Sequence, residues 1–329
     1  MTILYKRLTA LVSWFTRFTT ITFLCFLSCS INAQSLGPGA RSVGADWSRS
    51  PVYGAQGMAA TAQPLASQIA IDILKQGGSA VDAAIAANAA LGLMEPTGNG
   101  IGGDLFAIVW DPKTQQLYGY NGSGRSPEGR DLDALLSAIE AMKSGGQLPK
   151  DYRGIPSHGS LAVTVPGTVD GWFALHERWG ALDMDEVLAP AAEYAEIGFP
   201  MSPVIAAAFA ANQRRFEQRE SMIEELDNAR ALYFPEGVAP AVGTMFRNPD
   251  LAKTLRTLGA EGRASFYQGR LAEQMADYFE AIDADLTAAD LANHVGEWVE
   301  PRGVDYHGAT RWELPPNGQG FAALMMLNI

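Results

Sequence analysis

Cysteine and long apolar segments are both scarce in this chain. The only two cysteines, Cys25 and Cys29, lie within the first 33 residues. If that segment is removed, neither a disulfide framework nor thiol chemistry is possible, and the rest must be stabilised by its core alone. No apolar run reaches the roughly 20 uninterrupted residues that a transmembrane helix needs.

Basic residues are few as well. The chain has 24 Lys and Arg against 36 Asp and Glu, a net charge of -12. Three of the basic residues lie in 1–33, a segment without any acid, so 21 basic and 36 acidic residues remain after it. No basic run alternates with aromatic side chains. A surface this acidic repels phosphate backbones, which excludes nucleic acid as an expected partner.

The first 33 residues are organised like a secretory signal peptide. Lys6 and Arg7 form a positive start, residues 21–27 (ITFLCFL) a short apolar centre, and residues 28–33 are polar and small. We therefore predict a signal peptide over 1–33 and a periplasmic or secreted protein without stable membrane association. An uncleaved anchor and a lipid on Cys29 are the alternatives that these residues leave open.

The remaining residues divide into a linker or extended arm at 34–56, rich in Gly, Ser and Pro, and a domain at 57–329. Periodicity and capping residues predict helices at 64–75, 80–93, 131–144, 169–178, 183–197, from 203, from 249 to a stop at Gly259, at 268–282, at 287–293 and from 319. Strands are predicted at 105–110, which reads as fully buried, and at 116–120, 161–165, 299–306 and 309–314. Helices and strands do not alternate regularly, so the fold class is α+β, a sheet covered by helices.

Three glycines, Gly98, Gly100 and Gly103, have the spacing of the dinucleotide-binding fingerprint, but the elements around them are in a different order. That fingerprint needs a strand before the loop and a helix after it, whereas here a helix precedes and a strand follows. The glycines fit a tight turn with close backbone packing, or the wall of an active-site cleft. Asp104, directly after them, fits a local hydrogen-bonding role better than a catalytic one.

Arg125 is the candidate binding residue. It lies in a Gly/Ser loop (NGSGRSP) behind the second strand of a predicted hairpin, where a guanidinium can bind a carboxylate in two-pronged fashion. A structural ion pair is the competing interpretation. The four histidines, at 158, 176, 294 and 307, show no paired spacing, so they read as surface or capping residues and no metal site or cofactor is expected.

Several short motifs in a fixed order resemble the γ-glutamyltransferase (glutathione hydrolase) family. They occur at residues 76–84 (QGGSAVDAA), 95–96, 100–103, 124–127 (GRSP), 165–169 (VPGTV), 179–191, 198–202, 266–269, 286–291 and 313–316. Each motif alone is weak, but this many in one order over residues 54–329 identifies the chain as similar to the large-subunit part of that family.

The resemblance implies an αββα N-terminal-nucleophile hydrolase sandwich, here incomplete, from a precursor that cuts itself into a large and a small subunit. The new N-terminal threonine of the small subunit attacks γ-glutamyl amides, with its own α-amine as the base. In such enzymes a large-subunit arginine holds the α-carboxylate of the substrate, a role that maps to Arg125. The expected partners are a small-molecule γ-glutamyl substrate and the small subunit.

The chain departs from the family pattern in two ways. No threonine is followed by Thr-His, so the nucleophile is not in this chain, no catalytic residue is assigned, and the fragment alone is expected to be inactive. Residues 97–100 and 317–320 also differ from the serine-rich loops usual at those places. Two alternatives therefore remain beside a γ-glutamyl hydrolase: a glutaryl or cephalosporin acylase of the same superfamily, and a non-catalytic exported scaffold.

Overall fold

A computed structural model of the chain describes residues 52–329, together with the strands β1 (Leu36–Gly37) and β2 (Arg41–Ser42). Two compact units are present, Met1–Ser50 and Pro51–Ile329. In the first, β1 and β2 pair antiparallel. The predicted signal peptide at 1–33 lies outside the described residues. So does most of the predicted linker, of which residues 52–56 are exposed and irregular.

The second unit begins with two helices that pack on each other, α2 (Pro64–Lys75) and α3 (Ala80–Met94). A reciprocal capping box between Ser79 and Asp82 fixes the start of α3. Most of the alanines of α3 are buried, because a helix without bulky side chains can be approached closely on several faces. This helix lies inside the helical layer.

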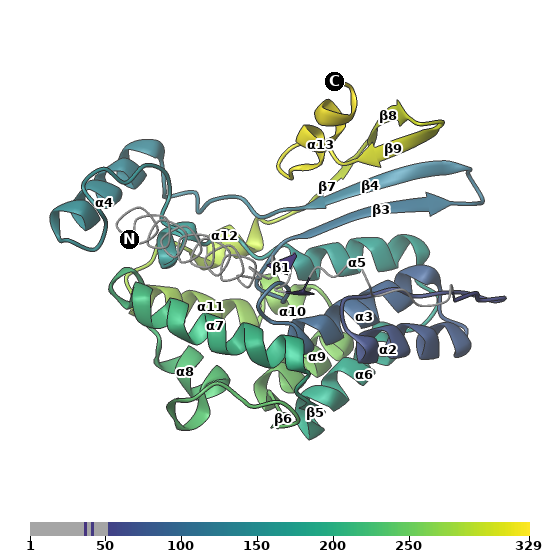
Figure 1. Cartoon of the computed structure of the whole chain (residues 1–329), viewed down its shortest axis with the longest axis horizontal. Helices are drawn as coiled ribbons and strands as arrows, with labels where there is room; N and C mark the ends of the chain where they lie inside the picture. The colour runs from purple at the N-terminus through teal and green to yellow at the C-terminus, as the bar shows by residue number, and fades with distance from the viewer. Residues whose placement is uncertain (1–35, 38–40, 43–51) are drawn as a thin grey trace, which may run out of the picture. The chain divides into compact units, whose positions relative to one another are not determined.

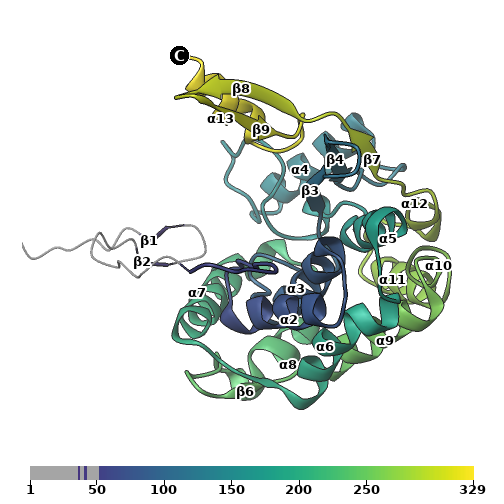
Figure 2. The same ribbon diagram turned by 90° about the vertical axis from the view of Figure 1, so that its right-hand side faces the viewer.

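The other helices complete that layer beneath the sheet (Figures 1 and 2). They are α5 (Thr168–Trp179), α6 (Met184–Ile197), α7 (Pro203–Arg219), α8 (Asp227–Tyr233), α9 (Pro249–Glu261), α10 (Ala264–Tyr267), α11 (Arg270–Ala281) and α12 (Ala288–Ala292). A short antiparallel pair, β5 (Phe199–Pro200) and β6 (Met245–Phe246), joins the end of α6 to the start of α9. Helix α4 (Leu132–Ser144) has a small core of its own, formed by Ile139, Leu148 and Met222.

The main sheet is antiparallel, with the order β3 (Leu105–Asp111), β4 (Gln116–Gly122) and β7 (Glu297–Val299). Alternate residues of β3 point to opposite faces. Leu105, Ala107 and Val109 pack on the main hydrophobic core, whereas Phe106, Ile108 and Trp110 are 44%, 39% and 56% exposed. The sheet thus has one face on the helices and one apolar face open to solvent.

A hairpin and a final helix lie on the open side of the sheet (Figure 1). Strands β8 (Arg302–Tyr306) and β9 (Ala309–Glu313) pair about the turn at His307 and Gly308, and α13 (Gly320–Leu327) packs against both. Leu314 reaches the backbone of Gly119, and the amide of Asn121 donates to Asn317 at 2.8 Å. These contacts lie over Gly119 and Asn121 of β4, whereas Phe106, Ile108 and Trp110 of β3 stay exposed.

Three predictions about the elements were wrong. The strand predicted at 161–165 is irregular apart from a 3-10 turn at Ser160–Ala162, because the buried guanidinium of Arg130 takes the carbonyls that a strand neighbour would need. The strand predicted at 299–306 is two strands, separated at Pro301. Residues 105–110 are not buried on both faces.

A fourth correction concerns the stop at Gly259. Helix α9 continues past it to Glu261 and is capped by Gly262, whose φ of +77° suits glycine. A Cβ on Gly259 would lie 2.7 Å from the Cα of Asp185, so this glycine permits α9 to approach α6 closely. The glycine is there for helix packing.

Candidate functional site

The loop that carries Arg125 is fixed through its backbone. The carboxylate of Asp104 accepts from the N–H of Gly124 at 3.2 Å and from the hydroxyl of Ser123 at 3.3 Å. On the other side, the N–H of Val165 donates to the carbonyl of Arg125 at 3.0 Å. A Cβ on Gly124 would lie 1.6 Å from the carbonyl oxygen of Val165, so only glycine fits there. The loop is rigidly seated, while 63% of the Arg125 side chain stays exposed.

The guanidinium of Arg125 reaches two acceptors, one in β7 and one just before it. It forms an ion pair with Glu297, and its Nη1 donates to the carbonyl of Val295 at 3.3 Å. Glu297 is registered opposite Asn121, which is itself opposite Phe106. Directly opposed residues share a face of a sheet, so Glu297 belongs to the open face. Arg125 therefore lies at the end of β4 on the open side of the sheet. The ion pair with Glu297 uses part of the hydrogen-bonding capacity of its guanidinium.

A buried network holds the segment that supplies these two acceptors. The carboxylate of Asp170, on α5, accepts from the N–H of Gly296 at 2.9 Å, from the hydroxyl of Tyr120 and from Arg263. Arg263 also donates to the carbonyl of His294 at 2.6 Å. Burial alone would raise the pKa of Asp170, but these hydrogen bonds outweigh it and hold the pKa below its usual value. An ionised carboxylate in the core thus positions residues 294–297.

His294 is the unexpected member of this network. The prediction of a surface or capping histidine was wrong here, because only 3% of the residue is exposed and its ring stacks on Tyr267. Its Nε2 is buried with no hydrogen-bond partner and lies 4.0 Å from Asp170. Burial lowers the pKa of His294, with Arg263 and Arg125 acting in the same direction, while Asp170 and Asp104 oppose it. The folded protein therefore holds this ring neutral.

The lowered pKa predicts a pH effect on stability. Below about pH 6.5 an unfolded histidine binds a proton that the folded His294 resists. The free energy of unfolding should then fall as the pH drops from 7 to 5, by at most about 1.4 kcal/mol per pH unit for this group. His294→Phe keeps the ring and removes the titration, so urea denaturation of the complete gene product should show a flatter slope.

The control for this measurement is the exposed His307. His307→Asn removes a histidine from a turn with φ of +49°, which asparagine tolerates, and should leave the slope as in the wild type. Equal slopes for the wild type and the His294→Phe variant would contradict the assignment.

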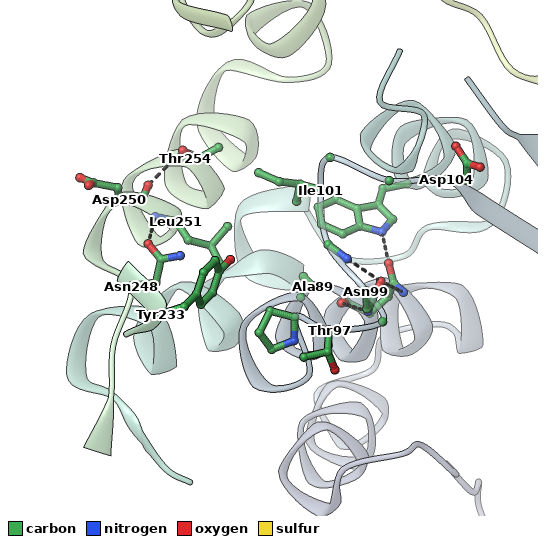
Figure 3. A pocket seen from close by; sticks show the side chains of 18 residues that line it. Ala89, Thr97, Asn99, Ile101, Asp104, Tyr233, Asn248, Asp250, Leu251 and Thr254 are labelled. Carbon is green, nitrogen blue, oxygen red and sulfur yellow. Dashed lines mark hydrogen bonds between the residues drawn. The ribbon is translucent and has the colours of Figure 1, made fainter. Parts of the chain in front are cut away.

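The glycine loop forms one wall of a pocket of about 630 Å³. Figure 3 shows Ile101 and Asp104 on one side of it, and Tyr233 of α8 and Asp250 of α9 on the other. A Cβ added at Gly98 or Gly100 would meet nothing within 4 Å, and one at Gly103 would meet only the carbonyl oxygen of Gly100, at an ordinary contact distance of 3.5 Å. Close backbone packing therefore does not explain these glycines, and the cleft-wall interpretation fits the loop better. Asp104 belongs to both sites, because it lines the pocket and also accepts hydrogen bonds from the loop that carries Arg125.

The N-terminus of α5 fixes the glycine loop. The N–H groups of Gly167 and Thr168 both donate to the carbonyl of Gly103 at 2.9 Å, and the Thr168 hydroxyl lies 3.0 Å from the carbonyl of Asp104. The order helix, loop, strand is as the sequence predicts, so no helix begins directly after the loop, as the dinucleotide-binding fingerprint would require. Asp104 takes the predicted local hydrogen-bonding role.

Residues 52–329 hold neither a metal cluster nor a membrane-spanning helix. No group of three or more His, Cys, Asp or Glu side chains in this part of the chain is arranged to hold a metal ion. Within the same residues, no helix combines the length and apolar character needed to cross a bilayer.

A helical layer on one face of an antiparallel sheet, with the other face open beside an arginine loop, is the architecture of half an αββα sandwich. The sequence profile described as Gamma-glutamyltranspeptidase matches residues 66–329. The chain belongs to this family, and the resemblance carried by the motifs is confirmed.

Relatives and a solved structure agree with this assignment. The chain is 36% identical to the glutathione hydrolase-like YwrD proenzyme of Bacillus subtilis, over 84% of the chain and 49% of that protein. It is 34% identical to the glutathione hydrolase proenzyme of the same organism, over 84% and 44%. The crystal structure of cephalosporin acylase from Bacillus halodurans matches with a TM-score of 0.72 and 40% identity, covering 87% of this chain and 52% of that one.

The chain thus spans about half the length of the curated relatives it matches. The predicted fold, an incomplete αββα sandwich, is confirmed by the structural match. Sequence reasoning missed Glu297 and Asp170, the two carboxylates that hold or position the Arg125 side chain. Glu297 meets Arg125 through the pairing of β4 with β7 across nearly 180 residues, and Asp170 acts from α5 through Gly296. The local sequence carries no signal for either contact.

Proposed function

We propose that this chain is the large-subunit part of a γ-glutamyl amide hydrolase or transferase precursor. Family membership and the similarity to two Bacillus subtilis proenzymes support the proposal. The observation that carries it is the position of Arg125, seated by its backbone on the open side of the sheet with most of its side chain accessible. A guanidinium in that place can bind the α-carboxylate of a γ-glutamyl group in two-pronged fashion.

The attacking group belongs to the rest of the precursor. We propose that its N-terminal threonine, freed by self-cleavage, forms an acyl-enzyme with the γ-carbonyl, using its own α-amine as the base. Water or an amino acid then resolves the acyl-enzyme. The residues of this chain bind and orient the substrate; none of them supplies the nucleophile.

The expected partner is the small subunit from the same precursor, and the open sheet face supports this. Phe106, Ile108 and Trp110 expose apolar area in one row along β3, while their neighbours on the other face are covered by helices. Contiguous exposed apolar area of this kind marks a surface that another chain covers.

The test is expression of the complete gene product. We expect two chains on a denaturing gel, with a threonine at the new N-terminus, and release of glutamate from glutathione. Replacement of that threonine by alanine should abolish both cleavage and activity. A full-length product that stays uncut and inactive with its threonine intact would contradict the proposal.

An acylase is the second candidate, favoured by the match to cephalosporin acylase at 40% identity. The altered loops at 97–100 and 317–320 point the same way, since Asn317 sits next to the open face through its bond to Asn121. Turnover of glutaryl amides in preference to γ-glutamyl amides by the same preparation would select this function.

We also propose that the protein is exported, to the periplasm or the medium, with its first 33 residues removed. The support is the sequence pattern of that segment, a basic start followed by a short apolar centre. Cell fractionation and N-terminal sequencing of the mature protein test it, and a product that retains Met1 in the cytosol would refute it.

A further inference from the structure

The segment that leads into β7 is anchored to the core on one side and holds Arg125 on the other. Its inward contact is the N–H of Gly296, which donates to the buried carboxylate of Asp170 at 2.9 Å. Its outward contacts come from the residues on either side of that glycine, since Val295 and Glu297 both accept from the Arg125 guanidinium. Both acceptors of Arg125 are thus one residue away from a single bond to the core.

One oxygen of Asp170 makes this bond. Its Oδ2 accepts from the N–H of Gly296 and from the hydroxyl of Tyr120, whereas Arg263 pairs with the other oxygen, Oδ1. A Cβ on Gly296 would lie 2.4 Å from the Tyr120 hydroxyl and 2.9 Å from Oδ2, so only glycine fits beside this oxygen. A carboxylate oxygen has two lone pairs, and both lone pairs of Oδ2 are in use.

The ring of His294 approaches the same oxygen. Its Nε2 lies 4.0 Å from Oδ2 of Asp170, is closed off from water and has no hydrogen-bond partner. Among the described residues, Asp170 is the only carboxylate within that distance of the ring. Tyr267 stacks on the ring, with 5.4 Å between the centroids, and a Cβ on Gly167 would lie 3.4 Å from Nε2. The imidazole is therefore enclosed beside a carboxylate oxygen that is fully occupied.

Charged groups on several elements act on this ring. Asp170 of α5 and Asp104 of the glycine loop favour its protonated form, while Arg263, just before α10, and Arg125 oppose it. The tyrosines of β4 and α10 in the network stay neutral, because burial raises their pKa values. Burial is the largest influence on His294 and lowers its pKa. The ring is neutral at pH 7.5, and acid adds a charge to the core.

We infer that His294 is a positioning residue, whose protonation draws Asp170 away from Gly296 and so releases the acceptors that hold Arg125. This inference rests on the proposed function, in which Arg125 binds the substrate carboxylate. A protonated imidazole is a donor at both nitrogens, and its charge attracts the carboxylate 4.0 Å away. To accept from Nε2, Oδ2 must lose one of its two donors. The bond to Gly296 is the longer of the two and is the one that opens.

Protonation of His294 and binding of a ligand at Arg125 therefore oppose each other. The ligand binds the protein with a neutral ring more tightly, so its dissociation constant rises as the pH falls through the pKa of the ring. This pKa lies below the ordinary value of 6.5, so the rise belongs to the range below pH 6.5. One linked proton changes a binding constant by at most about 10-fold per pH unit.

The experiment measures the inhibition constant of L-glutamate against hydrolysis of L-γ-glutamyl-p-nitroanilide, with the complete, self-processed protein at pH 7.5 and 5.5. The wild type should bind L-glutamate roughly 3-fold to 10-fold more weakly at the lower pH. His294→Phe keeps a ring that stacks on Tyr267 but takes no proton, so its ratio of the two constants should fall to about 1. Ionisation of L-glutamate itself contributes equally in both proteins.

Tyr120→Phe tests the same step without changing the histidine. It removes one of the two donors from Oδ2 of Asp170, so the protonated ring can be accepted while Gly296 stays bound, and the ratio should again fall. His307→Asn is the matched control. It removes a histidine from an exposed turn with φ of +49°, which asparagine tolerates, and should keep the ratio of the wild type.

The outcomes separate the inference from the proposed function. A wild-type ratio near 1, or a ratio that His294→Phe leaves unchanged, would overturn the inference while the proposed function stands. If His294→Phe does not self-process, an unchanged ratio in Tyr120→Phe has the same meaning. A self-processed wild type that does not cleave L-γ-glutamyl-p-nitroanilide at pH 7.5 would overturn the proposed function, and the inference with it.

Discussion

Replacing Arg125 by lysine in the complete gene product is expected to raise KM for a γ-glutamyl substrate by roughly 10-fold to 100-fold, with a smaller change in kcat. Lysine keeps the charge but lacks the planar fork that binds a carboxylate through two parallel hydrogen bonds. Its single ammonium would also be held by Glu297, which already pairs with Arg125. Steady-state kinetics with L-γ-glutamyl-p-nitroanilide measure the effect.

Arg302→Lys is the control for this substitution. Arg302 is similarly exposed and carries a looser pair with Glu300, at 3.6 Å, so the same change of residue should leave KM as in the wild type. If Arg125→Lys has a KM equal to that of this control, Arg125 takes no part in substrate binding and serves as a surface ion pair.

Replacing Asp170 by asparagine is expected to lower the free energy of unfolding by about 3 kcal/mol, the lower end of the range for breaking a buried ion pair. The side chain of Asp170 is 5% exposed and that of Arg263 is 30% exposed, so the guanidinium left behind regains only part of its hydration. Urea denaturation of the processed protein measures the loss. KM should rise as well, because Gly296 and the segment that supports Arg125 lose their anchor.

Two further variants test the cause of that loss. Asp250→Asn changes the same group where it is 90% exposed and should cost far less. Adding Arg263→Met to Asp170→Asn removes both charges, and the double variant should recover part of the stability, since no uncompensated charge remains in the core. A loss in Asp170→Asn no larger than in Asp250→Asn would show that the network is not stabilising.

Much of the helical layer could be predicted from local sequence, because the ends of its helices are encoded there. The capping boxes at Ser79 and Asp183 and the Ser202-Pro203 and Asn248-Pro249 starts all begin helices in the structure. Each of these signals acts within four residues, which is the span of one backbone hydrogen bond in a helix. The hairpin at 105–122 is equally local.

The wrong predictions concern residues whose structure depends on groups that are distant in the sequence. Residues 161–165 have the composition of a strand, yet Arg130 binds their carbonyls from 30 residues away. His294 reads as a surface residue until the fold brings Asp170 and Tyr267 around it. The position of Arg125 at the end of a hairpin was predicted. Its partner Glu297 lies 172 residues further along the chain and follows only from sheet pairing.

The open face gives the protein an optical reporter of its own assembly. Trp110 is 56% exposed and Trp312, which lines the same surface hollow as Trp110, is 46% exposed. Indole emission shifts to shorter wavelength when the ring leaves water. Docking of a second sheet should therefore shift the fluorescence spectrum without any added dye. Stopped-flow emission could then time the completion of the sandwich against self-cleavage, and so order the two events in the maturation of the precursor.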